Sequence, residues 1–200
     1  MSKWNKETTT NEILEGLDLS GKKVLVTGAS GGLGEETARA LAAAGASVIM
    51  AARDNTKNLE AKERILSSNS EAKLELHELN LASLEDVRSS AEEFLSKNES
   101  LDLLVNNAGI MCTPFGHTTD GFEQQFGVNH LGHYLFTGLM MPALEKSGAS
   151  RVVCLSSGAH LICGVNLDDP MFERRDYDGW DSYGQSKSAN ALFAREFDRR

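Results

Sequence analysis

Short apolar runs alternate along this chain with longer stretches whose apolar residues recur at helical spacing. The runs are rich in Val, Leu, Ile and Ala and lack a polar face, which is typical of strands that are buried on both sides. We expect five such strands, at residues 23–27, 47–52, 72–78, 101–106 and 151–156. We expect helices at residues 33–44, 55–68, 83–97, 121–146 and 183–200, and a short one at 11–16.

Strands that alternate with helices imply right-handed crossovers and a parallel sheet. The pattern therefore predicts an α/β fold, a Rossmann-like doubly wound sheet with strand order 3-2-1-4-5. No repeat, low-complexity tract or linker divides the chain. We assign residues 1–20 to an N-terminal arm and residues 21–200 to one domain.

Composition narrows the class of protein. The net charge of −9 argues against binding to a nucleic-acid backbone. No apolar run is long enough to span a membrane and no signal peptide is evident, so the expected location is cytoplasmic. Cys112, Cys154 and Cys163 have no C-x-x-C spacing, and His130 and His133 have no further ligands at metal spacing. We therefore expect neither a disulfide framework nor a metal site.

A glycine-rich turn, T-G-A-S-G-G-L-G, lies between the first predicted strand and helix at residues 27–34. Free N–H groups and a partial positive charge at the start of that helix suit a pyrophosphate. Gly28 permits the tight turn, Gly32 lets the backbone approach the phosphates, and Gly34 allows close contact of helix and strand. We include Ser30 and Leu33 in this predicted site; the alternative is an ordinary turn.

Tyr183 and Lys187 are four residues apart in Y-G-Q-S-K, so on a helix they share one face. A tyrosine beside a fixed ammonium shares its proton with a substrate more readily. The pair follows the glycine turn, then Asn106-Asn107-Ala108-Gly109, then Ser156-Ser157. This ordered set resembles the short-chain dehydrogenase/reductase family, and the matches run from about residue 21 to the last residue.

The resemblance implies a nicotinamide cofactor. The glycine spacing G-x-x-x-G-x-G is similar to the family's own, whereas the G-x-x-G-x-x-G of related epimerases and dehydratases is absent. Ala52 stands where an acid would bind the ribose of NAD, and Arg53 follows it. Because a guanidinium pairs well with phosphate, we expect NADP rather than NAD. The alternative is that Arg53 pairs with Asp54 on a solvated loop.

Further cofactor residues follow from the same resemblance. Asn80 and Leu81 stand where the family usually has Asp-Leu beside the adenine, and an Asn there makes a weaker contact. Asn107, Ala108 and Gly109 follow the fourth strand, at the edge of the sheet where such cofactors bind.

The resemblance also implies the chemistry, a hydride transfer between NADP(H) and an alcohol or carbonyl substrate. Tyr183 would exchange the proton, Lys187 would assist it and hold the ribose, and Ser157, rather than Ser156, would bind the carbonyl oxygen. The main chain of Asn129 would hold a water that links the lysine to solvent. From the residues alone, an asparagine inside a helix can equally mark a kinked turn.

Residues 158–182 resemble the loop of retinol-dehydrogenase-like and WW-domain-oxidoreductase-like members, which act on apolar alcohols and carbonyls. That implies a lipophilic small-molecule substrate. Because the family's last strands would follow Arg200, we expect a C-terminally truncated domain that is a poor enzyme alone, and a possible homodimer in the longer parent. The alternatives are a nucleotide-binding fragment without turnover and a naturally compact variant.

Overall fold

The computed structural model describes residues 4–200, so residues 1–3 of the predicted arm lie outside the described part. Its sheet is parallel, with the order β3-β2-β1-β4-β5, which confirms the predicted fold class and strand order. The strands are β1 Lys23–Thr27, β2 Ser47–Ala52, β3 Lys73–Glu78, β4 Leu103–Asn106 and β5 Arg151–Cys154.

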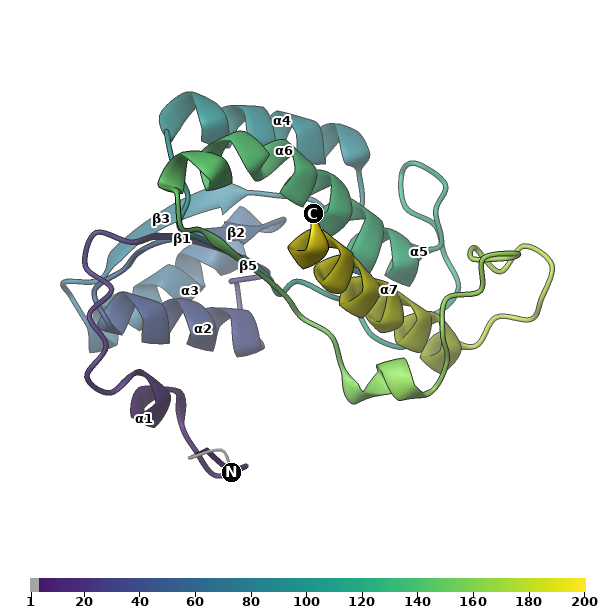
Figure 1. The fold of residues 1–200 in the computed structure, drawn as a ribbon, viewed down its shortest axis with the longest axis horizontal. Coiled ribbons are helices and arrows are strands. Elements are labelled where there is room, and N and C mark those ends of the chain that lie inside the picture. The colour runs from purple at the N-terminus through teal and green to yellow at the C-terminus, as the bar shows by residue number, and fades with distance from the viewer. Residues whose placement is uncertain (1–3) are drawn as a thin grey trace.

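Helices cover both faces of the sheet (Figure 1). One face carries α2 (Gly32–Ala43) and α3 (Asn55–Ser68), and the other carries α4 (Leu84–Lys97) and α6 (Gly132–Ser147). The last helix, α7 (Gly179–Arg199), packs against α5 (Gln124–Phe126) and the π-helical η1 (Gly127–Leu131). Two short elements complete the described chain, α1 (Thr10–Leu14) in the arm and the 3₁₀-helix η2 (Gly158–Leu161) after β5.

Alternate residues of each central strand enter two separate cores. Leu25 and Ile49 pack with Phe94 of α4 and with α6, whereas Val24 and Met50 pack against α2 and α3. Burial on both faces explains why the strands read as continuous apolar runs. Because all five strands are parallel, their carboxyl ends lie at the same edge of the sheet, and the loops that carry the candidate site emerge there.

The helical stretch predicted at residues 121–146 is present, but it starts three residues later and contains a π-turn. Gly121 has a φ of +84° and belongs to a turn, and α5 begins only at Gln124. The Glu123 carboxylate accepts the backbone N–H groups of Gln125 and Phe126 and so fixes that start. One π-turn, η1, then separates α5 from α6. The sequence pattern could not show this break because the apolar spacing continues through it.

The last helix starts earlier than residue 183. The Asp178 carboxylate accepts the N–H groups of Trp180 and Asp181, so α7 begins at Gly179. The Phe193 ring lies 5.3 Å from the ring of Tyr134 on α6, while Leu192 stays exposed.

Candidate active site

A cavity of about 440 Å³ opens at the carboxyl edge of the sheet. Its wall includes most of the residues that the sequence predicts for cofactor binding: Gly28, Ser30, Leu33, Gly34, Arg53, Asn80, Leu81, Asn107, Ala108 and Gly109. Gly32 does not line it; that residue borders a neighbouring depression with Glu35 and Arg39. Tyr183 and Lys187 lie outside the wall as well.

The glycine turn brings three pieces of backbone into close contact. Gly28 has a φ of +67°, and a Cβ there would lie 2.8 Å from the Ala108 Cα. A Cβ on Gly34 would lie 2.2 Å from the Gly28 carbonyl oxygen. At the start of α2, Gly31 provides no side-chain cap, so N–H groups of the first turn stay available. These features fit the phosphates of a dinucleotide.

Thr27 ties the glycine turn to the loop after β4. Its Oγ1 accepts the N–H groups of Asn107 (3.0 Å) and Ala108 (2.9 Å). The Asn107 side chain donates in return to the Thr27 carbonyl oxygen at 2.7 Å. The two loops that border the cavity are thus held together at the end of β1.

His133 extends this network into α6, and the sequence reasoning missed it. Its Nε2 lies 2.8 Å from Thr27 Oγ1 and its Nδ1 lies 3.0 Å from the Asn129 carbonyl oxygen. Burial lowers the pKa of His133 to about 4, so the ring is neutral near pH 7. Since the carbonyl can only accept, Nδ1 carries the proton and Nε2 accepts from the Thr27 hydroxyl. The one signal in the sequence was its spacing of four residues from Asn129, which places the two residues on the same face of a helix.

Arg53 stands at the cavity with an exposed guanidinium that has no hydrogen bond or ion pair within residues 4–200. Asp54 instead accepts the Lys57 N–H at 3.1 Å and caps α3. The alternative pairing of Arg53 with Asp54 is therefore not what the described chain adopts. Arg53 remains available for a ligand anion.

The Asn80 amide is held in place by its own neighbours. Its Nδ2 donates to Asp86 at 2.8 Å, and its Oδ1 accepts the Ala82 N–H at 3.1 Å. Together with Leu81 it lines the cavity on the β3 side. A contact of this pair with an adenine stays a prediction.

Tyr183 and Lys187 share one face of α7, and the Lys187 Nζ lies 5.5 Å from the centre of the Tyr183 ring. Lys187 is only 4% exposed and donates to the Leu155 carbonyl oxygen at 3.3 Å. Burial lowers the pKa of Lys187 below its ordinary value. A Cβ on Gly109 would lie 3.4 Å from this Nζ, so the ammonium lies next to the wall of the cavity.

The two adjacent serines make different contacts. Ser156 donates its hydroxyl to the Lys187 carbonyl oxygen at 2.9 Å, which ties the end of β5 to α7. Ser157 accepts the Ala159 N–H at 3.2 Å and caps η2, and its own proton has no acceptor within residues 4–200. No hydrogen bond joins Ser157 to Tyr183 in that same range. Ser157 is thus the serine whose hydroxyl is free to donate.

Asn129 lies within the π-turn η1, so the kinked turn weighed from the sequence is present. Its side chain exchanges hydrogen bonds with the backbone of Ile110 (2.8 and 2.9 Å) and donates to Ser186 at 3.0 Å. Its carbonyl oxygen faces His133 and accepts from Asn190 at 3.1 Å. Asn129 therefore joins the cavity loop to the helix of Tyr183. A water on its main chain stays a prediction.

Neither a metal-binding cluster nor a membrane-spanning helix occurs within residues 4–200. Residues 4–200 hold no group of three or more His, Cys, Asp or Glu side chains that could bind a metal ion. None of the helices in this range combines the length and the apolar character needed to cross a membrane.

Comparisons with known proteins agree with this geometry. A family model described as short chain dehydrogenase matches residues 22–168. Retinol dehydrogenase 12 of Mus musculus is 44% identical over 184 residues, which cover 92% of this chain and 58% of that protein. The WW domain-containing oxidoreductase of Gallus gallus is 40% identical over 205 residues, 99% of this chain and 50% of that protein.

A solved structure points the same way. A putative short chain dehydrogenase from Escherichia coli CFT073, complexed with NADPH, matches with a TM-score of 0.70 and 26% identity, over 91% of this chain and 74% of that one. The chain belongs to the short-chain dehydrogenase family and is similar to its retinol dehydrogenases, as the motifs predicted. It spans little more than half the length of the curated relatives that it matches.

Proposed function

We propose that the protein is an NADP(H)-dependent oxidoreductase that interconverts an alcohol and a carbonyl compound. The observation that carries this proposal is the meeting of two features at Gly109. This residue lines the cavity that begins at the glycine turn, and it also adjoins the Lys187 ammonium beside Tyr183. A dinucleotide in the cavity would thus end next to the one tyrosine–lysine pair that the motif predicts.

Tyr183 would give its proton to the carbonyl oxygen during reduction and take it back during oxidation. The buried Lys187 ammonium would assist this proton transfer and bind the cofactor ribose. Ser157 would donate its free hydroxyl proton to the carbonyl oxygen as negative charge develops there. Asn129 would keep Ile110 and α7 in register. A nicotinamide bound in the cavity would supply the hydride.

The preference for NADP rests on Arg53. Within residues 4–200 its guanidinium has no partner, and it lies at the cavity beside Ala52; among those residues, none that lines the cavity is acidic. A planar guanidinium binds a 2′-phosphate with charge-assisted hydrogen bonds. The complex of a related dehydrogenase with NADPH supports the same choice.

The proposed substrate class rests on the names of the related proteins and not on the shape of a substrate pocket. Proteins named retinol dehydrogenase are 41–44% identical to this chain. We therefore propose an apolar alcohol or carbonyl such as a retinoid. A homodimer through the exposed side of α6 and α7, near Tyr134 and Leu192, also belongs to this proposal.

The test uses the purified protein with NADPH and all-trans-retinal, with the retinol formed measured by chromatography and NADPH affinity measured by fluorescence titration. Tyr183→Phe should lower kcat by roughly a thousandfold because the proton donor is lost. The affinity for NADPH should stay within twofold. Tyr134→Phe, a change of the same kind at an exposed tyrosine on α6, should leave both values unchanged. Turnover by Tyr183→Phe within tenfold of the wild type would contradict the assignment.

A further inference from the structure

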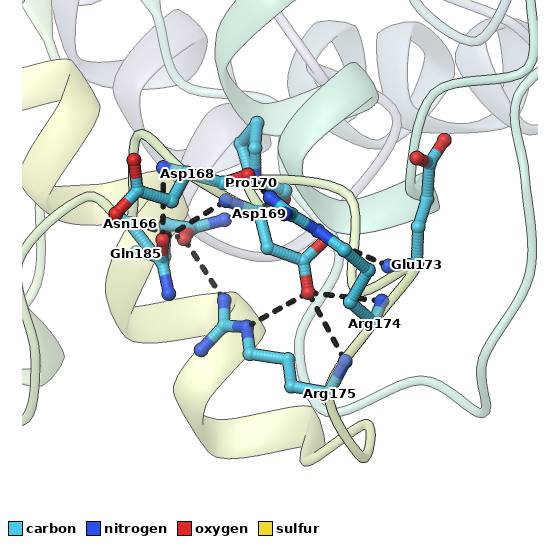
Figure 2. Close-up of polar contacts among 8 residues, drawn as sticks. All are labelled: Asn166, Asp168, Asp169, Pro170, Glu173, Arg174, Arg175 and Gln185. Atoms are coloured by element: carbon cyan, nitrogen blue, oxygen red, sulfur yellow. Dashed lines mark hydrogen bonds and ion pairs between the residues drawn. The ribbon is translucent and has the colours of Figure 1, made fainter.

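The segment that joins Ser157 to Tyr183 is fastened to α7 by the side chain of Gln185 (Figure 2). Gln185 is only 1% exposed. Its Oε1 accepts the Asn166 N–H at 3.1 Å, and its Nε2 donates to the Pro170 carbonyl oxygen at 2.8 Å. One amide therefore satisfies two backbone groups of the segment, and it does so from the middle of the Y-G-Q-S-K motif.

Asp169 organises the turn that follows. Its carboxylate accepts the N–H groups of Glu173 (2.8 Å), Arg174 (3.1 Å) and Arg175 (3.1 Å), as Figure 2 shows. Burial opposes ionisation of this carboxyl, but the three N–H donors outweigh burial and keep the pKa of Asp169 below its ordinary value. The charged form is thus the one that closes the turn.

Arg175 connects these two centres. Its Nη2 donates to Gln185 Oε1 at 3.1 Å, and its Nε lies 3.8 Å from Asp169 Oδ2. The guanidinium carbon also lies 3.6 Å from the centre of the Phe172 ring. Phe172 has a φ of +57°, which a bulky residue adopts only when its surroundings hold it there. The three side chains thus act as one unit, which we call the loop clamp (Asp169, Arg175 and Gln185).

Gln185, the member of the clamp that lies on α7, is on the side of that helix opposite to the tyrosine–lysine pair. At 100° per residue, Gln185 lies about 160° around the helix from both Tyr183 and Lys187, and Ser188 lies about 60° from Gln185. Ser188 donates to the Cys163 carbonyl oxygen at 2.7 Å, so the same side of α7 also holds the start of the segment. The segment is therefore held directly by the helix that carries Tyr183.

We propose that the loop clamp is a set of positioning residues that fixes residues 163–178 relative to Tyr183 and so sets the affinity for the carbonyl substrate. The role rests on the proposed function. None of the three side chains lines the cavity at the glycine turn, so their loss leaves cofactor binding intact. Substrate binding and cofactor binding thereby respond to different residues.

Kinetics separate this role from a general effect on folding. Asp169→Asn turns one acceptor oxygen into a donor that faces N–H groups and a guanidinium. We expect the KM for all-trans-retinal to rise about tenfold, while kcat stays within threefold and the Kd for NADPH is unchanged. The matched control is Glu173→Gln, the same chemical change on an exposed side chain of the same turn, which should alter none of the three values.

Limited digestion with trypsin tests the fastening without any turnover. Trypsin cuts after Arg174 and Arg175, whose N–H groups the Asp169 carboxylate holds. Asp169→Asn should speed cleavage at these two sites about tenfold, with the other tryptic sites unchanged, because the local opening becomes easier. Gln185→Met, which removes all three contacts of the amide, should do the same. If Asp169→Asn fails to fold, Gln185→Glu is used in its place. It keeps the acceptor oxygen but loses the donor to the Pro170 carbonyl oxygen, and it is tested by the same KM and cleavage measurements.

A rise in KM together with faster cleavage at Arg174 and Arg175 supports the proposal. Unchanged cleavage overturns it, and so does faster cleavage with an unchanged KM, since the clamp would then be structural only. If the wild-type protein binds NADPH but does not reduce retinal, the retinoid part of the proposed function fails, and the cleavage rates still decide whether the clamp holds the segment.

Discussion

The two sides of the candidate site are built in different ways. On the cofactor side, Gly28 and Gly34 let backbone pack directly on backbone. On the tyrosine side, buried amides and carboxylates hold the loops: Gln125 bonds Cys112, Tyr177 and Gly179, while Asp169 and Gln185 bind the segment before α7. The first design demands particular glycines at fixed spacing. The second needs only some polar side chain at the right place in space, so it leaves no sequence motif.

The sharpest test of this difference lies where the two sides meet, at the adjacent serines. Ser157→Ala should lower kcat by roughly a hundredfold or more, since it removes a donor to the developing oxyanion. Ser156→Ala removes only the bond to the Lys187 carbonyl oxygen and should cost no more than a few-fold. Steady-state reduction of retinal by NADPH measures both. The reverse order would transfer the role to Ser156.

On the cofactor side, a single methyl group should be enough to disrupt the site. The Cβ of Gly34→Ala would meet the Gly28 carbonyl oxygen at 2.2 Å, and backbone cannot move aside cheaply. We expect a loss of about 2–3 kcal/mol in the free energy of unfolding and much weaker NADPH binding. Gly31→Ala is the control, because a Cβ there meets no atom of residues 4–200 within 4 Å. Equal stability of the two variants in urea titrations would refute the close-packing argument.

His133 links the two sides and should make the protein sensitive to acid. Burial, with the nearby Lys187 ammonium and His130 adding to it, lowers the pKa of His133 from 6.5 to about 4. Between these values the unfolded chain binds a proton that the folded chain does not, so stability is complete above pH 6.5 and falls as the pH drops. From pH 7 to pH 5 this residue should account for about 2 kcal/mol. Urea unfolding of the wild type and of His133→Asn at both pH values gives the difference, and parallel pH dependences would exclude the effect.

The smallest effect is expected at the rim of the cavity. Arg53→Ala should weaken NADPH binding about tenfold, or about 1.4 kcal/mol, by removing a charge-assisted contact, and should leave NADH binding nearly unchanged. Arg88→Ala, an exposed arginine on α4, is the matched control. Titrations with both cofactors make the comparison. Equal losses of affinity for NADH and NADPH would show that Arg53 does not act through the 2′-phosphate.

The sequence predicted the sheet almost completely, because strands that are buried on both faces are continuous apolar runs. It also predicted most of the residues that line the cavity, since the glycine turn and the N-N-A-G loop are local motifs. Three of the predicted cofactor residues, Gly32, Tyr183 and Lys187, do not line the cavity; the φ of +57° explains the glycine at position 32, which borders a neighbouring depression instead. Long-range partners were out of reach, as the pairing of Thr27 with His133 shows.

Helix boundaries failed where a side chain, not the apolar pattern, decided them. The capping carboxylates of Glu123 and Asp178 set the starts of α5 and α7. An N-cap Asp three residues before another acid, as in Asp178 and Asp181, resembles a capping pattern that could have been read from the sequence. The loop clamp offered no such signal, because its three members are brought together only by the fold.

The π-turn at Gly127–Leu131 has a consequence for how this chain can change over evolution. A π-turn accommodates an extra residue within a continuous helix, and a deletion there would restore the regular α-helical winding. Such a deletion would rotate everything on one side of the turn by about 100° relative to the other. Asn129 would then swing away from either Ile110 or Ser186. The helix therefore cannot lose even one residue at this turn, although some side chains elsewhere along it are free to change.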